Sequence, residues 1–89
     1  MALLVVLHRV KDYDVWRKEY DKARSHQASS GVTEESVYRK KDDPNNVLVL
    51  HRFATMAEAQ AFMANPELQS IMERAGIAAP PRVEFYEEI

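Results

Sequence analysis

The stretch ALLVVLHRV, residues 2–10, decides the fold, because apolar residues fill consecutive positions instead of alternating with polar ones. The two faces of such a strand carry Leu3, Val5 and Leu7 on one side and Leu4, Val6 and Val10 on the other. In an antiparallel sheet with one hydrated face, every second strand residue is polar. We therefore predict a strand over Ala2–Val10 that is covered on both faces.

An amphipathic helix is predicted directly after this strand. Asp12 is a typical helix N-cap residue, and apolar residues then recur at spacings of three and four, which places them on one helix face. This stripe consists of Tyr13, Trp16, Tyr20 and Ala23. The run Ser29-Ser30-Gly31 ends the helical region and leads the chain into the next strand.

Two further strands are predicted over Val32–Lys40 and Val47–Phe53, joined by Asp42-Asp43-Pro44-Asn45-Asn46. A type I turn with Pro44 at its second position and Asn45 after it fits this connection. Val32–Lys40 is the most polar predicted strand, as expected for the edge of a sheet. Val47–Phe53 is apolar on both faces, like residues 2–10.

The stretch Thr55–Gly76 reads as two short helices. Thr55 and Glu58 have the spacing of a capping box. Asn65-Pro66 then places a cap residue and a proline at the start of the second helix, and Gly76 is a typical residue after a helix C-terminus. A last strand is predicted over Arg82–Ile89.

In chain order the elements read β-α-β-β-α-β, the split βαβ arrangement, in a single domain of residues 1–89. A right-handed crossover makes the first two strands parallel with a gap between them. The third strand enters this gap, and the fourth pairs with the free side of the first. We therefore predict a ferredoxin-like α+β fold with an antiparallel sheet of order 4-1-3-2 and the helices on one face. A second copy of the chain is expected to cover the other face.

Composition excludes several classes of function. A net charge of −2 without a clustered basic face argues against nucleic-acid binding. The absence of cysteine excludes disulfides, thiolate metal sites and a cysteine nucleophile. The two glycines, Gly31 and Gly76, form no glycine-rich phosphate loop, so a nucleotide cofactor is not expected. No apolar stretch is long enough to span a membrane, and Ala2–Leu7 lacks the preceding positive charge of an export signal. We expect a cytoplasmic protein without membrane contact.

Three stretches carry a resemblance to a known family: Val10–Trp16, Asp43–Val47 and Phe53–Leu68. With them the chain resembles the dimeric α+β barrel superfamily, in particular its small antibiotic-biosynthesis-monooxygenase-like and cyclase-like members. The resemblance implies a homodimer in which two sheets pack face to face, with a ligand cleft between the helices and the sheet of each subunit. It also implies one of several activities: cofactor-free oxygenation of aromatic compounds, haem degradation, cyclisation, isomerisation, or none.

The chain departs from the monooxygenase-like pattern at specific positions. Phe53 matches an aromatic residue at the end of the third strand, but the acidic residue expected two positions earlier is His51. The helix that follows contains no histidine, so haem degradation lacks a proximal ligand. The position of a functional asparagine in haem-degrading relatives corresponds to His8.

His8 and His51 are therefore the candidate catalytic residues, as a base or as an anchor for a carbonyl or phenol oxygen. Each interrupts an apolar strand, and a buried imidazole is costly unless it is hydrogen-bonded. Both lie on one face, with Phe53, only if His8 opposes an odd-numbered residue of the third strand. The alternative is that both are structural. A metal site would lack a third ligand, and His26 suits the negative end of the first helix.

The predicted substrate-binding residues are large side chains on the helices and the third strand. They are Tyr13, Trp16, Tyr20, Phe53, Phe62 and Met72. Aromatic residues with polar tips often border pockets, and methionines form adaptable walls. The alternative is that the same residues only fill the core.

We expect a small homodimeric protein that binds a small hydrophobic or aromatic molecule and needs no cofactor. As an enzyme it would be a cofactor-independent monooxygenase or a cyclase or isomerase. The alternative is a non-catalytic ligand-binding or stress-related dimerisation module.

Overall fold

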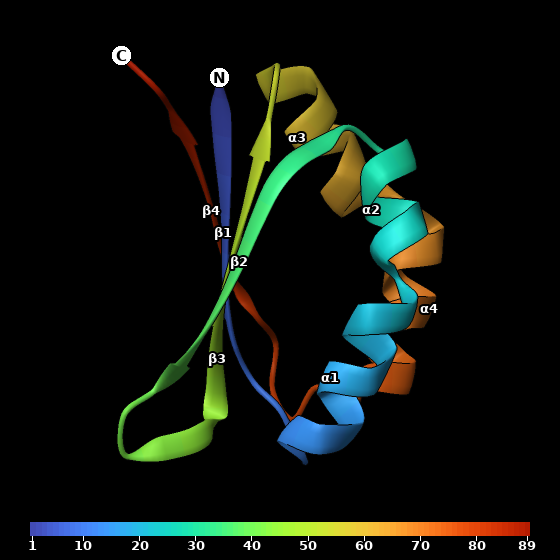
Figure 1. The fold of residues 1–89 in the computed structure, drawn as a ribbon, viewed down its shortest axis with the longest axis vertical. Coiled ribbons are helices and arrows are strands. Elements are labelled where there is room, and N and C mark those ends of the chain that lie inside the picture. Colours follow the sequence, from blue (N-terminus) through green and yellow to red (C-terminus); the bar gives the residue numbers. More distant parts are fainter.

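The computed structural model describes all residues 1–89 and contains one sheet whose helices lie on a single side (Figure 1). The strands are β1 (Ala2–Arg9), β2 (Val32–Lys40), β3 (Asp43–Phe53) and β4 (Arg82–Glu87). The helices are α1 (Tyr13–Lys22), α2 (Arg24–Ser29), α3 (Met56–Ala64) and α4 (Pro66–Ala75). No helix is long and apolar enough to cross a membrane.

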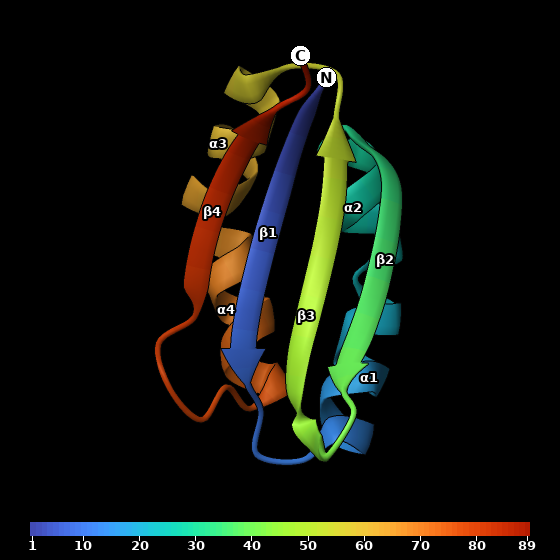
Figure 2. The ribbon, with the colours of Figure 1, turned by 90° about the vertical axis from the view of Figure 1, so that its left-hand side faces the viewer.

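The sheet has the order β2-β3-β1-β4, and every neighbouring pair is antiparallel (Figure 2). This is the predicted order 4-1-3-2, so the ferredoxin-like topology is confirmed. β1 and β3 pair with Ala2 opposite Phe53 and His8 opposite Val47. Because position 47 is odd, His8, His51 and Phe53 share the face that the helices cover. Arg9 and Arg52 lie on the opposite face of the sheet.

The helix ends follow the expected capping chemistry. The Asp12 carboxylate accepts hydrogen bonds from the Asp14 and Val15 amides, and the Thr55 hydroxyl accepts one from the Glu58 amide. Asn65 caps α4 ahead of Pro66. Gly76 ends that helix in the left-handed conformation at φ 78°, which glycine adopts without a Cβ penalty.

The first helical region differs from the prediction of one helix, because it breaks at Ala23 into α1 and α2. The Ala23 amide donates to the Glu19 and Tyr20 carbonyls, and α2 begins at the next residue. No glycine or proline marks this break in the sequence.

The predicted hairpin turn over residues 42–46 is wrong. The connection is Lys41-Asp42, and β3 already begins at Asp43. The pairing of β3 with β2 is irregular directly after Asp43, because Lys40 pairs with Asp43 whereas the preceding Arg39 pairs with Val47. Contacts from outside the hairpin hold it: Asn45 accepts the Val10 amide on its backbone oxygen and the Tyr13 amide on its side chain. These bonds tie the hairpin to the connection between β1 and α1. Strand ends also differ slightly, since β1 ends at Arg9 and β4 at Glu87.

The core lies between the sheet and the helices. Leu4, Val47 and Phe53 are its largest fully buried side chains. The opposite face of the sheet is also apolar but uncovered by this chain: Leu3, Val5, Leu48 and Leu50 are half-buried there, and Leu7 and Tyr38 are exposed. We call this surface the open face.

Candidate functional site

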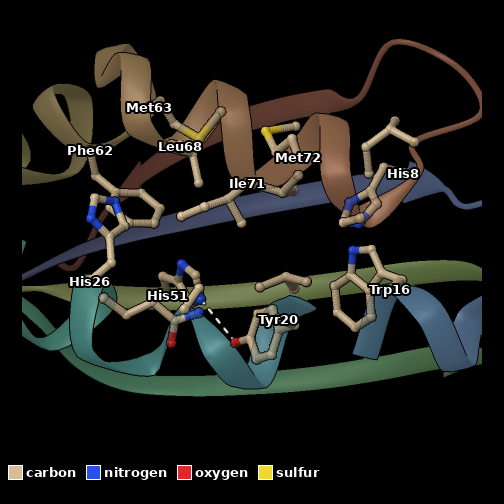
Figure 3. A pocket seen from close by; sticks show the side chains of 16 residues that line it. His8, Trp16, Tyr20, His26, His51, Phe62, Met63, Leu68, Ile71 and Met72 are labelled. Atoms are coloured by element: carbon tan, nitrogen blue, oxygen red, sulfur yellow. Dashed lines mark hydrogen bonds between the residues drawn. The ribbon is translucent and has the colours of Figure 1, made fainter. Parts of the chain in front are cut away.

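A cavity of about 70 Å³ lies between the sheet and α4. It exists because α4 packs mainly against α1 and leaves space above the middle of β1 and β3. Figure 3 shows the side chains that surround it. Its apolar roof comes from α3 and α4 and includes Met63, Leu68, Ile71 and Met72. Its polar groups come from β1, β3, α1 and α2.

Most of the predicted site residues line this cavity. They are His8, His51, Trp16, Tyr20, Phe62 and Met72. Tyr13 and Phe53 do not line it. The Tyr13 ring is half-buried at the edge of the core, with its centre 3.9 Å from the guanidinium carbon of Arg39 and 5.9 Å from the centre of the Trp16 ring. Phe53 is completely buried and supports the site from below, with its ring 6.5 Å from that of His51 and 5.5 Å from that of Phe62.

His8 occupies one end of the cavity. Its ring packs 5.5 Å from the Trp16 ring, and neither ring nitrogen has a hydrogen-bond partner. Only 6% of the residue is exposed, and this burial lowers the pKa of His8 to about 4. His8 is therefore a neutral imidazole at physiological pH, with one donor and one acceptor still unused.

His51 lies four residues along the sheet from His8, because it pairs with Leu4. At the usual rise per residue this places the two histidines about 13 Å apart along the strands. The Nε2 atom of His51 is 3.0 Å from the Tyr20 hydroxyl, whereas Nδ1 has no partner. Burial lowers the pKa of His51 to about 4 as well. The site thus presents a second neutral imidazole.

Two further polar residues of the cavity were not among the predicted site residues. His26 and Gln27 on α2 both line it. His26 Nδ1 is 3.4 Å from a Glu67 carboxylate oxygen on α4, and its Nε2 is buried without a partner. The apolar stripe of α1 contained the signal that could have identified them, because Ala23 is followed at helical spacing by residues 26 and 27.

The chemistry available here is proton acceptance and hydrogen bonding in an apolar enclosure. Four buried imidazole nitrogens have no partner: both of His8, Nε2 of His26 and Nδ1 of His51. A buried polar atom without a partner is destabilising, so a ligand that satisfies one of them gains affinity. No three His, Asp or Glu side chains form a group that could hold a metal ion.

The fold and the cavity together define a ferredoxin-like α+β protein with a mostly apolar cavity between its helices and its sheet. No family model matches the sequence, and no curated protein matches it. Solved structures do match, and the structural neighbours include proteins of the antibiotic biosynthesis monooxygenase family. The resemblance predicted from the sequence is therefore confirmed for the fold.

Three of these structures illustrate the likeness. A protein from Bordetella bronchiseptica named as an antibiotic biosynthesis monooxygenase has a TM-score of 0.84 at 14% identity, covering 99% of this chain and 96% of its own. One of the same name from Nitrosomonas europaea has a TM-score of 0.80 at 15% identity, with 100% and 99% covered. SnoaB from Streptomyces nogalater, a cofactor-independent oxygenase, has a TM-score of 0.82 at 11% identity, with 99% and 92% covered.

Proposed function

We propose that this protein is a homodimer that binds a small hydrophobic or aromatic molecule in the cavity and oxygenates it without a cofactor. The observation that carries this proposal is the set of unpartnered imidazole nitrogens in an otherwise apolar cavity. The likeness in fold to SnoaB, a cofactor-independent oxygenase, supports the choice of reaction.

The proposed chemistry needs a base and an electron-rich substrate. A neutral His51 or His8 would accept a hydrogen bond from a phenol or from a carbon between aromatic rings. Burial lowers the imidazole pKa to about 4, so the proton would move only as the substrate anion forms beside the ring, because the two opposite charges then stabilise each other. The resulting anion would react with dioxygen, so that a methylene group becomes a carbonyl and the second oxygen atom leaves as water. The substrate then supplies all the electrons. Exclusion of water by the apolar walls would protect the anion.

The volume of the cavity limits what enters without movement. About 70 Å³ corresponds to roughly two water molecules, and an engineered cavity of about 150 Å³ is known to bind benzene. A ring-sized ligand therefore requires the roof to move outward. Met63 and Met72 are suited to this, because unbranched thioether side chains change shape at low cost.

Ligand binding is tested by thermal shift with phenols, quinones, polycyclic aromatics and haem. We expect phenols or polycyclic aromatics to stabilise the wild-type protein, by about 2.7 kcal/mol at a hundredfold excess over Kd. His8→Ala and His51→Ala should reduce this shift. Arg52→Ala is the matched control, because Arg52 adjoins His51 in sequence but lies on the open face. A shift that survives both histidine variants would place the ligand elsewhere.

Dimerisation through the open face is tested by sedimentation of Val5→Glu. We expect the wild type to be a dimer and Val5→Glu to be a monomer, because a carboxylate in the middle of an apolar interface would lose its hydration. Val15→Glu is the control: Val15 is an exposed valine on α1, 48% accessible, and lies away from the open face. A monomeric wild type would refute the interface.

A non-catalytic ligand-binding module is the second candidate, and the low basicity of the two buried histidines favours it. Oxygen uptake with a bound phenol separates the two, since a carrier consumes none. An isomerase would instead convert its ligand to a product of the same mass, and a cyclase to a ring-closed product, in both cases without consuming oxygen.

A further inference from the structure

A chain of polar contacts runs from the surface into the cavity and ends at His51. Arg24 on α2 lies 3.6 Å from Oε1 of Glu35 on the edge strand β2. The other carboxylate oxygen, Oε2, is 3.2 Å from the Tyr20 hydroxyl. That hydroxyl is 3.0 Å from Nε2 of His51 (dashed line in Figure 3). The remaining nitrogen of His51, Nδ1, has no partner in the protein.

The number of protons that these groups can donate decides the direction of the hydrogen bonds between them. A carboxylate only accepts hydrogen bonds, and a tyrosine hydroxyl has one proton to donate. Tyr20 therefore donates to Glu35 and must accept from His51, which places the imidazole proton on Nε2. In the reverse arrangement the oxygens of Tyr20 and Glu35 would face each other at 3.2 Å without a proton between them.

Two features hold this arrangement in place. Burial and the adjacent Glu35 carboxylate raise the pKa of Tyr20 well above its ordinary value, so the hydroxyl keeps its proton. Arg24 pairs with Oε1 of Glu35 and leaves Oε2 for Tyr20. A hydrogen bond to a charged acceptor is also stronger than one to a neutral imidazole.

We propose that Glu35, acting through Tyr20, fixes His51 as the Nε2–H tautomer, so that the cavity presents the Nδ1 lone pair and selects ligands that donate a hydrogen bond. Hydroxylated aromatics fit this requirement, whereas their ethers and quinones offer only acceptors. Glu35 is a positioning residue, because it acts through Tyr20 and does not line the cavity. The ligand preference rests on the proposed function, but the tautomer does not.

The tautomer is measured in the ligand-free protein by ¹⁵N–¹H correlation NMR of the histidine rings at neutral pH. In the wild type we expect protonated Nε2 and bare Nδ1 in His51. In Glu35→Leu the Tyr20 proton has no carboxylate to bind, so it turns to Nε2 and the imidazole proton moves to Nδ1. The side chain of Glu35 is 24% exposed on an edge strand, so water could take its place beside Tyr20. Glu35→Val is therefore a second variant, with another apolar side chain that keeps water from the Tyr20 hydroxyl.

Glu34→Leu is the matched control. Glu34 is the neighbouring residue on β2, but it pairs with Arg52 on the open face and its side chain is 72% exposed. Its replacement removes the same charge and should leave the His51 tautomer unchanged. A wild-type His51 protonated on Nδ1, or a tautomer that stays the same in both Glu35 variants, would overturn the proposal.

The ligand preference is measured with 1-naphthol and 1-methoxynaphthalene, in which a methyl group replaces the donated proton. We expect the wild type to bind the naphthol about fivefold more tightly, as one net hydrogen bond implies, and Glu35→Leu to lose or reverse this ratio. Equal affinities in the wild type would overturn the selection step. If neither compound binds while the tautomer behaves as described, the proposed ligand site fails and the role of Glu35 stands.

Discussion

Acidification from pH 7 to pH 4 should destabilise the native state strongly, because His8 and His51 resist protonation in the fold. Burial lowers both pKa values from 6.5 to about 4. Between these values the unfolded chain binds more protons than the native protein, so the free energy of unfolding falls as the pH falls. Each histidine contributes roughly 3 kcal/mol to this loss. The contribution is fully present above about pH 6.5.

Urea unfolding at a series of pH values measures this effect. His8→Leu and His51→Leu should each remove about half of the difference in stability that arises between pH 6.5 and pH 4. In the double variant, most of this difference in stability between pH 6.5 and pH 4 should be absent. A wild-type stability that stays constant from pH 7 to pH 5 would contradict the prediction, because it would mean that both rings accept protons while folded.

Truncation of Phe53 should cost about 3–5 kcal/mol of stability, the range found for Phe→Ala in tightly packed cores. Phe53 is completely buried, and its ring supports those of His51 and Phe62. Phe85→Ala is the matched control: Phe85 is 37% exposed on β4, so the same substitution removes less buried surface. Equal losses in urea unfolding for the two variants would refute the central place of Phe53 in the core.

Local patterns predicted the fold well because the helices and strands are marked by their own capping, helix-ending or apolar residues. The doubly apolar residues 2–10, the caps at Asp12, Thr55 and Asn65, and Gly76 are all interpretable within a few residues. The hairpin was misplaced because proline and asparagine are typical turn residues. Here Asn45 instead accepts hydrogen bonds from the Val10 and Tyr13 amides, more than thirty residues away. Such long-range bonds leave no local pattern.

The site was predictable only in part for the same reason. Two histidines inside apolar strands were a visible anomaly, but whether they share a face depends on register, which alternates with period two. His26 was assigned to the end of a helix, although its spacing of three residues from Ala23 places it on the buried helix face. Glu35 looked like an ordinary polar residue of an edge strand. Its importance appears only when Tyr20 and His51 are brought beside it.

The break at Ala23 makes one end of the cavity easy to remodel during evolution. α2 is six residues long and carries His26 and Gln27 into the site. One residue inserted at the break would rotate every α2 side chain by about 100° around its axis. His26 and Gln27 would then leave the cavity and others would replace them, while β1, β3 and their histidines stayed in place. A lineage with this fold can thus acquire a new ligand preference through a single codon insertion, without rebuilding its sheet.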